Sequence, residues 1–279
     1  MRPNFLGIGV QRAGTTWLAA CLRSHPAIFL PEQKELAYFN GRGDRSLADY
    51  EARFDAAADE AGVTAVGEIT PSYIRDADAV NRIAGTLPEA RLIVVLREPV
   101  GRAYSAYELF RERWFHGRPF EDVCTPESDL VVSSRYAPQL ERVLAHFDRE
   151  RVGVFLYDDI ERDPAGLLQR VYAFLGVDPS HAPPSRGERI NRVVWPGAQR
   201  RLEAAGLGVP LELAKATPAA KWAKRAHAEL GRRRDARARG RRHEKLWPLF
   251  ERDVAEVEAM LDLDLTRWRP RGASTRAAA

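Results

Sequence analysis

Glycine, arginine and threonine residues occur together near the start of the chain, between Gly9 and Thr16. The apolar run before them predicts a buried strand, and a helix is expected to begin near Gly14. The first N–H groups of a helix have no partner within it and carry partial positive charge, so they attract anions. Arg12 adds a full charge, and Thr15 adds a hydroxyl donor. The segment therefore predicts a site for a phosphate-like group.

The glycines of this loop have the spacing of the nucleotide triphosphatase pattern G-x-x-x-x-G-K-[ST]. Thr15 replaces the lysine of that pattern, however, and the cation stands inside the loop at Arg12. The next long apolar run then ends in Arg97, where such enzymes usually carry a magnesium-binding acid. Both differences favour added positive charge over a metal ion. The Cys and His residues also lack zinc-ligand spacing, so we expect no metal site.

Four short segments within about the first 110 residues form a set in sequence order. They are Q-R-A-G-T-T-W-L at 11–18, K-E-L-A-Y-F-N at 34–40, G-E-I-T-P-S-Y at 67–73 and L-I-V-V-L-R-E-P-V-G-R-A-Y-S at 92–105. The set resembles the sulfotransferases that use 3′-phosphoadenosine 5′-phosphosulfate (PAPS). The first and last segments are similar to the family's 5′-phosphosulfate loop and 3′-phosphate motif. The middle two are similar to the K-E-x-x-F-F and E-K-[ST]-x-x-Y segments of heparan-sulfate-type and related bacterial members.

The resemblance implies two groups of residues that bind the donor. Those of the 5′-phosphosulfate loop are Arg12, Ala13, Gly14, Thr15, Thr16 and Trp17. Arg12 would also stabilise the charge that develops as the phosphate departs. Arg97 and Ser105 would hold the 3′-phosphate, which distinguishes PAPS from adenosine 5′-phosphosulfate. Further candidates for the donor pocket are Arg186, Arg189 and Arg192.

An acceptor hydroxyl or amine must lose a proton as it attacks, which requires a base within hydrogen-bond reach. The resemblance implies that Glu35 is this base, with Lys34 acting on the sulfate or on Glu35. We expect the apolar neighbours Leu36, Tyr38 and Phe39 to raise the pKa of Glu35 toward neutrality. The structural alternative for the two side chains is an exposed ion pair. Among the histidines, His25 is expected at a helix end, where its charge suits the dipole, and His116 is a weaker alternative base.

One position departs from the resembling family. Ile69 stands where heparan-type enzymes carry the lysine of E-K-[ST]-x-x-Y, so a cation near the sulfate and acceptor is missing. We therefore expect an acceptor other than heparan itself. Glu68, Thr70 and Tyr73 remain candidates for acceptor or donor contacts, and a structural role is an equal alternative for Glu68.

The elements that must position these residues follow a βαβ pattern. Near-continuous apolar runs, typical of a parallel sheet covered on both faces, occur at 5–10, 64–67, 92–96 and 152–157. Helices are predicted at 15–24, 47–60, 76–87, 99–114, 138–150 and 164–175, with a last one near 247–261. We expect a P-loop-like, doubly wound α/β fold, flanked by helices and closed by a C-terminal helical cap.

We expect a single domain at 1–268, with a nucleotide-binding core at 1–177, a basic helical cap at 178–268 and a disordered tail at 269–279. The net charge of +4 is uneven, because residues 181–247 hold 17 Lys and Arg against 6 Asp and Glu. Two cysteines, Cys21 and Cys124, make a disulfide framework improbable, and the chain shows neither a signal peptide nor an apolar run that spans a membrane. These features favour a cytoplasmic protein.

The sequence therefore predicts an enzyme that transfers a sulfuryl group from PAPS to a hydroxyl or amine of a carbohydrate, lipid or secondary metabolite. Its partner would be a small-molecule or glycan acceptor, without nucleic acid. The alternatives are a P-loop-type nucleotide kinase and a non-catalytic basic protein that binds nucleic acid or acidic surfaces through residues 181–247.

Overall fold

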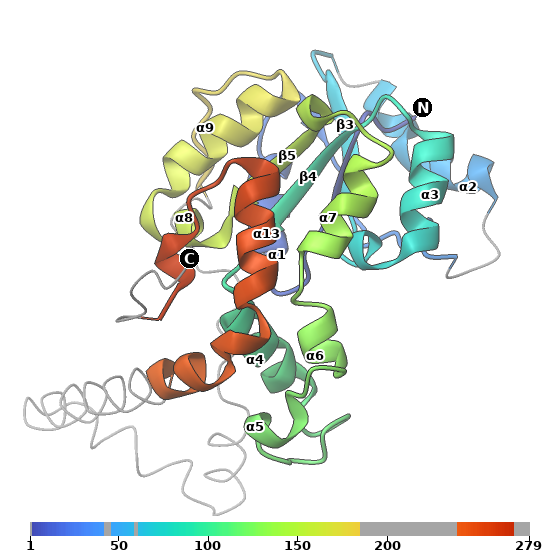
Figure 1. Cartoon of the computed structure of the whole chain (residues 1–279). Coiled ribbons are helices and arrows are strands. Elements are labelled where there is room, and N and C mark those ends of the chain that lie inside the picture. Colours follow the sequence, from blue (N-terminus) through green and yellow to red (C-terminus); the bar gives the residue numbers. More distant parts are fainter. Residues whose placement is uncertain (1, 42–45, 59–60, 185–238, 271–279) are drawn as a thin grey trace, which may run out of the picture. The chain divides into compact units, whose positions relative to one another are not determined.

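The computed structural model describes residues 2–41, 46–58, 61–184 and 239–270 (Figure 1). Its strands are β1 (Phe5–Gly9), β2 (Ile28–Phe29), β3 (Ala65–Ile69), β4 (Arg91–Leu96) and β5 (Val152–Leu156). The helices of the first half are α1 (Thr15–Arg23), α2 (Leu47–Glu51), α3 (Ala77–Thr86) and α4 (Pro99–Phe110). The later helices are α5 (Phe120–Val123), α6 (Asp129–Val132), α7 (Ala137–Leu144), α8 (Tyr157–Arg162), α9 (Pro164–Leu175) and α13 (Glu251–Leu261). Short 3-10 helices occur at Ala52–Ala58, Tyr73–Arg75, Arg149–Arg151, Trp247–Leu249 and Thr266–Trp268.

All five strands are parallel, in the order β2-β3-β1-β4-β5. The chain leaves the central strand β1 toward β2 and β3, then crosses back to β4 and β5 on the other side. The direction of winding therefore reverses between β1 and β4, and ligands of open α/β sheets bind beyond the carboxyl ends of the strands at such a point. This arrangement confirms the predicted P-loop-like, doubly wound parallel sheet.

The sheet is buried from both sides by helices. Tyr172 of α9 donates its hydroxyl to the Cys21 carbonyl of α1 at 3.2 Å, which ties these two helices together. On the front of the sheet in Figure 1, α13 runs beside α7, and α7 also contacts α3. The strands between them are almost entirely buried, as their continuous apolar runs predict. Pro99 and Pro164 each open a helix, at the first turn where a missing N–H is tolerated.

Some predicted boundaries differ from the structure. The helix predicted at 99–114 ends at Phe110 and continues as a turn, before His116 and Gly117 adopt left-handed conformations at φ 49 and 71. The helix predicted at 138–150 ends at Leu144 and gives way to a turn before β5. The helix predicted at 47–60 is a short α-helix followed by a 3-10 segment. Strand β2 was not predicted, because two residues are too few to show a periodicity.

Contacts within the chain define two compact units, one of residues 1–188 with 247–279 and one of residues 189–246. The final helix α13 belongs to the first unit, where it packs on α7. Most of the basic segment 181–247, the arginines Arg186, Arg189 and Arg192, and the last residues of the tail lie outside the described residues. Within the described ranges, no helix combines the length and apolar character needed to cross a bilayer.

Candidate functional site

The N-terminus of α1 is open at the carboxyl edge of the sheet. Its first backbone hydrogen bond runs from the Leu18 N–H to the Gly14 carbonyl at 3.1 Å, and nothing in the described residues accepts from the N–H groups of Thr15, Thr16 and Trp17. The first turn holds no acidic residue, and Gly14 gives no side-chain cap. These three N–H groups are therefore free to bind an anion.

Helices α3, α4, α7 and α9 are closed at the same end by carboxylates, whereas the N-terminus of α13 has no side-chain cap. Glu98 accepts from two N–H groups of α4 at 2.6 and 2.7 Å, and Asp76 and Asp163 each accept from an N–H group of α3 and α9. Asp253 of α13 accepts from the Tyr136 and Ala137 N–H groups at the start of α7, at 2.7 and 3.0 Å. The contrast shows that this fold caps these helices with its own acids and leaves α1 for an external one.

Gly14 adopts a left-handed conformation with φ 84, directly before α1. A Cβ at this position would lie 2.5 Å from Cδ1 of Ile160 and 3.2 Å from the ring of Tyr157. Both neighbours belong to α8, which follows the edge strand β5. The left-handed backbone therefore favours glycine here, and a Cβ would also require the end of the Ile160 side chain to move. The Ala13 N–H, which we also predicted as a phosphate contact, donates instead to the Val10 carbonyl at 3.3 Å.

The two predicted phosphate motifs meet at Arg12. Its Nε donates to Oγ of Ser105 on α4 at 3.1 Å, and Nη1 of Arg97 donates to the Arg12 carbonyl at 2.9 Å. The Arg97 guanidinium also lies 4.4 Å from the centre of the Tyr157 ring. Burial, and then the nearby Arg97 charge, lower the pKa of Arg12. Two guanidinium groups thus lie close together, and no carboxylate of the described chain pairs with either of them.

Two residues of this cluster were not among the predicted site residues. Tyr157 follows β5 at the same edge of the sheet, and a search of strand ends could have found it. Arg102 lies within the 3′-phosphate motif, one turn before Ser105, and is almost fully buried. It donates to the Gln11 carbonyl and to the Ser134 hydroxyl, each at 3.1 Å, and burial lowers its pKa. Arg102 therefore holds the start of the loop in place.

Lys34 and Glu35 lie where the chain crosses the end of β3. The Glu35 N–H donates to the Ile69 carbonyl at 3.2 Å, which places the pair one strand away from the loop after β1. Their side chains form an ion pair at 2.6 Å, with 19% of Lys34 and 48% of Glu35 exposed. Leu36 and Phe39, next to the pair in sequence, are buried in the core. The role of Glu35 as a base stays a prediction.

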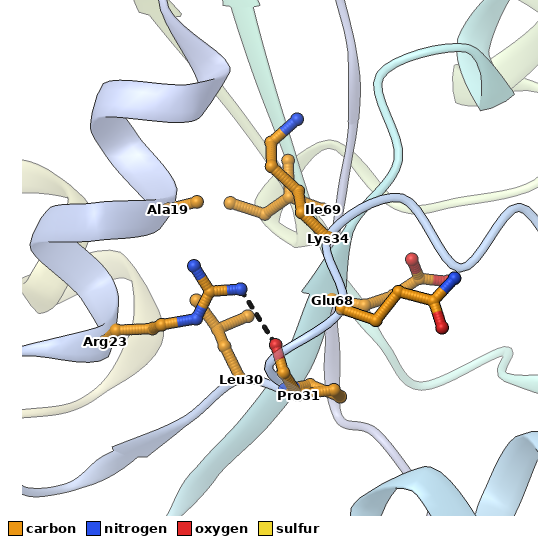
Figure 2. A pocket seen from close by; sticks show the side chains of 8 residues that line it. Ala19, Arg23, Leu30, Pro31, Lys34, Glu68 and Ile69 are labelled. Atoms are coloured by element: carbon orange, nitrogen blue, oxygen red, sulfur yellow. Dashed lines mark hydrogen bonds between the residues drawn. The ribbon is translucent and has the colours of Figure 1, made fainter. Parts of the chain in front are cut away.

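A small hollow of about 180 Å³ adjoins this pair (Figure 2). Its lining residues come from α1, from the segment after β2 and from the end of β3: Ala19, Arg23, Leu30, Pro31, Gln33, Lys34, Glu68 and Ile69. Arg23 extends from α1 and donates to the Pro31 carbonyl at 2.8 Å (Figure 2). The flank of α1 and Lys34 therefore border the same space.

Ile69 and Glu68 are both buried at the end of β3. The Ile69 side chain packs over Gly7 of β1, where a Cβ would come within 2.8 Å of it. Ile69 therefore replaces the family's lysine with a core residue. The Glu68 carboxylate accepts hydroxyl donors from Tyr50, Thr70 and Tyr73 at 3.3, 2.6 and 2.7 Å. Burial raises the pKa of Glu68, and these hydrogen bonds oppose that shift.

The histidines and cysteines lie apart from this chemistry. Nδ1 of His25 accepts from the Ala27 N–H at 3.1 Å, so Nε2 is the nitrogen that donates to the Asp178 carbonyl at 3.0 Å. His25 lies directly after α1, at the helix end where it is expected. His116 is exposed beyond α4. Cys21 and Cys124 are buried thiols, and burial raises the pKa of Cys124 to about 12. The described residues contain no group of three or more potential metal ligands.

A family model for the sulfotransferase domain matches residues 2–194. The chain belongs to the sulfotransferase domain family. In the solved structures, it superimposes on a sulfotransferase from Alicyclobacillus acidocaldarius with a TM-score of 0.69 and 24% identity, covering 96% of this chain and 99% of that one. At that identity the likeness establishes the fold alone.

Among curated proteins, this sulfotransferase domain is similar to parts of longer chains. It is 30% identical over 199 residues to the bifunctional heparan sulfate N-deacetylase/N-sulfotransferase 4 of Mus musculus, covering 64% of this chain and 23% of the relative. It is 32% identical over 185 residues to the human heparan sulfate glucosamine 3-O-sulfotransferase 3B1, covering 63% and 46%. It is 33% identical over 136 residues to the membrane-associated sulfotransferase kil1 of Dictyostelium discoideum, covering 46% and 29%. The chain spans less than half the length of each.

Proposed function

We propose that this protein transfers a sulfuryl group from PAPS to a hydroxyl or amine of a carbohydrate, lipid or secondary-metabolite acceptor. The observation that carries the proposal is the open N-terminus of α1 beside Arg12 and Arg97, two cations without a carboxylate partner among the described residues. Anions are stabilised by free helix N–H groups and by guanidinium forks. A donor with phosphate groups at both ends would bring negative charge to the α1 N-terminus and to the two arginines.

The residues present fit this donor. The N–H groups of Thr15, Thr16 and Trp17 would hold the 5′-phosphate, and Gly14 lets the backbone approach it without a side chain. Arg97 and Ser105 would hold the 3′-phosphate. PAPS, when bound, supplies the activated sulfuryl group, and Arg12 is placed to stabilise negative charge on the departing phosphate. Because Arg12 and Ser105 already touch at 3.1 Å, the two ends of the site are preorganised toward each other.

The acceptor would be activated by Glu35, which accepts the proton of the attacking hydroxyl or amine. Its carboxylate is exposed enough to meet an acceptor, and Lys34 holds it at 2.6 Å. The relatives' names refer to heparan sulfate, and we extend to this protein only the broader class of carbohydrate, lipid or small-metabolite acceptors. Ile69 lies in the core where heparan-type enzymes carry a lysine, which supports an acceptor other than heparan.

Calorimetry tests donor recognition. We expect the desulfated product 3′-phosphoadenosine 5′-phosphate (PAP) to bind more tightly than adenosine 5′-phosphosulfate, because only PAP carries a 3′-phosphate. Arg97→Ala should remove this preference. The matched control is Arg252→Ala, an arginine of α13 that is 93% exposed and should leave the preference unchanged. A preference that survives Arg97→Ala would remove Arg97 from its role, and no interaction with either nucleotide would overturn the proposal.

Transfer itself is tested with PAPS that carries labelled sulfate and a panel of sugar, lipid and amine acceptors. We expect label to move to at least one acceptor class without added magnesium, because the site offers cations in place of a metal-binding acid. Turnover that requires magnesium and a nucleoside triphosphate would favour the kinase alternative. Retention of nucleic acid without retention on immobilised PAP would favour the non-catalytic alternative.

A further inference from the structure

The loop that carries Lys34 and Glu35 is bonded along its main chain to one short segment, residues 68–73. Three main-chain N–H groups of the loop donate to groups of that segment. The pairs are Glu35 to the Ile69 carbonyl at 3.2 Å, Ala37 to the Thr70 hydroxyl at 3.3 Å and Phe39 to the Tyr73 hydroxyl at 3.5 Å. Two of the three acceptors are side-chain groups. The path of the loop is therefore set by particular side chains of the 68–73 segment.

The backbone of this loop adopts conformations that are unfavourable for residues with a side chain. Glu35 and Ala37 adopt left-handed conformations, at φ 62 and 55, although neither is a glycine. Such conformations are disfavoured for residues with a Cβ and persist where surrounding contacts determine them. The N–H groups of both residues are among those bound by the 68–73 segment. The segment therefore holds the loop in the shape that presents the Glu35 carboxylate.

Glu68 orients the two hydroxyl groups that accept hydrogen bonds from the loop. Its buried carboxylate binds the hydroxyls of Thr70 and Tyr73 at 2.6 and 2.7 Å, which fixes both hydroxyl protons on Glu68. The lone pairs of the two hydroxyl oxygens then face the loop and accept its N–H groups. Tyr50 adds a third hydroxyl to Glu68 at 3.3 Å, and its ring stacks on Tyr38 of the loop at 4.5 Å. One carboxylate thus orients both hydroxyl groups that accept N–H groups of the loop.

We propose that Glu68, Thr70 and Tyr73 are positioning residues that set the Lys34–Glu35 pair for proton transfer, an inference that rests on the proposed function. They act through Glu35 and touch neither donor nor acceptor, because Glu68 and Thr70 are at most 2% exposed and Tyr73 is fully buried. The spacing of the G-E-I-T-P-S-Y segment follows from this role. Its Glu, Thr and Tyr form a hydrogen-bonded template for the K-E segment.

The test uses variants that remove single hydroxyl groups and keep the carbon framework. Tyr73→Phe and Thr70→Val each remove one acceptor of a loop N–H, whereas Thr70→Ser retains its hydroxyl. The matched control is Tyr172→Phe, because the buried Tyr172 donates its hydroxyl to the Cys21 carbonyl, outside the loop. Glu68→Gln is a further variant, and the hydroxyl variants keep the proposal testable if that protein does not fold.

Hydrogen exchange gives a readout that does not depend on activity. In Tyr73→Phe and Thr70→Val, we expect the amides of residues 35–39 to exchange about ten-fold faster or more, because they lose native acceptors. Thr70→Ser and Tyr172→Phe should leave exchange in this loop unchanged. Unchanged exchange in Tyr73→Phe and Thr70→Val would overturn the proposal.

Kinetics separate positioning from a general structural role. We expect kcat to fall about 10- to 100-fold in Tyr73→Phe and Thr70→Val, since a misplaced base loses its geometry, while PAP affinity stays within about two-fold. In a Glu35→Gln background, the same substitutions should cause no further loss of kcat. A further loss of kcat in the Glu35→Gln background would show that these residues do not act through Glu35. A wild-type chain that transfers no sulfuryl group would instead overturn the proposed function, whereas unchanged loop exchange in an active enzyme overturns only the template.

Discussion

At the scale of single residues, Gly14 meets two requirements of the site at once. Its φ of 84 lies in the region that a side chain disfavours by about 1–2 kcal/mol, and a Cβ there would require the Ile160 side chain of α8 to shift. The same α8 supplies Tyr157, whose ring lies under the Arg97 guanidinium. A side chain at Gly14 would therefore strain the start of α1 and press on the helix that supports Arg97.

We predict that Gly14→Ala weakens PAP binding by at least about ten-fold, because the left-handed strain alone corresponds to about one factor of ten in an equilibrium constant. Calorimetry on the folded variant measures the affinity for PAP. Gly85→Ala is the matched control, since Gly85 lies within α3 and a Cβ there meets nothing within 4 Å. An alanine in such a helix position is neutral or stabilising. Equal PAP affinity in the two variants would contradict the role given to the α1 N-terminus.

Removal of the Glu35 carboxylate should impair catalysis but not donor binding. We predict that Glu35→Gln lowers kcat by about 10²–10⁴-fold, the usual contribution of a general base, with PAP affinity nearly unchanged. Steady-state kinetics and calorimetry on the same preparation check both parts. Glu32→Gln, an exposed neighbour in the same segment, is the control. Full activity in Glu35→Gln would assign the base elsewhere.

At the scale of elements, the sequence predicts best what is locally repetitive. Four of the five strands follow from apolar runs, and Pro164 marks the start of α9 correctly. The loops of the site follow from motif spacing, because glycine and arginine positions are set by local backbone needs. The remaining features depend on residues far apart in the chain. Neither the contact of the Glu68 segment with the Lys34–Glu35 loop nor the cap of α7 by Asp253 can be read from a local pattern, since partners that meet across the fold leave no periodicity.

That cap joins α13 to the site. Asp253 accepts two N–H groups at the start of α7, and the Tyr136 hydroxyl next to them donates to the Arg97 carbonyl at 2.7 Å. Burial raises the pKa of Asp253 to about 6, although its two hydrogen bonds oppose that shift. Because the folded protein then binds a proton more tightly than the unfolded chain, its stability falls as the pH rises from about 4 to about 6.

We predict that Asp253→Asn removes this pH dependence. The free energy of unfolding of the wild type, relative to the variant, should fall by up to about 3 kcal/mol between pH 4 and pH 7, from a shift of about two pKa units. Denaturant unfolding at several pH values measures the difference. Asp262→Asn, at an exposed position on the end of the same helix, is the control. A wild-type stability that rises across this window relative to Asp253→Asn would contradict the sign.

At the scale of the whole molecule, the two ends of the described chain meet at the donor site. The Trp268 indole donates to Asp158 of α8 at 2.9 Å, and Arg267 pairs with Asp159 at 3.2 Å. These contacts brace the helix whose Ile160 closes against Gly14. The site therefore depends on segments near the beginning, the middle and the end of the described sequence, so it forms only when the whole unit is folded.

This assembly holds buried or half-buried arginines in one place without acidic partners among the described residues, namely Arg12, Arg97 and Arg102. Like charges that lie together destabilise the fold, and burial deepens that penalty. A bound dianion relieves it only in the folded state. Binding of the donor or of PAP therefore stabilises the folded protein by an amount that its concentration relative to Kd determines.

We predict that PAP raises the melting temperature far more than adenosine 5′-phosphate does at the same concentration. At one hundred times its Kd, PAP should add about 2.7 kcal/mol, which corresponds to a shift of about 5–10 °C for a domain of this size. The shift should shrink as salt screens the arginines, and Arg97→Ala should abolish the difference between the two nucleotides. Differential scanning calorimetry measures all three. An equal shift from inorganic sulfate at the same concentration would contradict recognition at two ends, because a single anion would then satisfy the whole cluster.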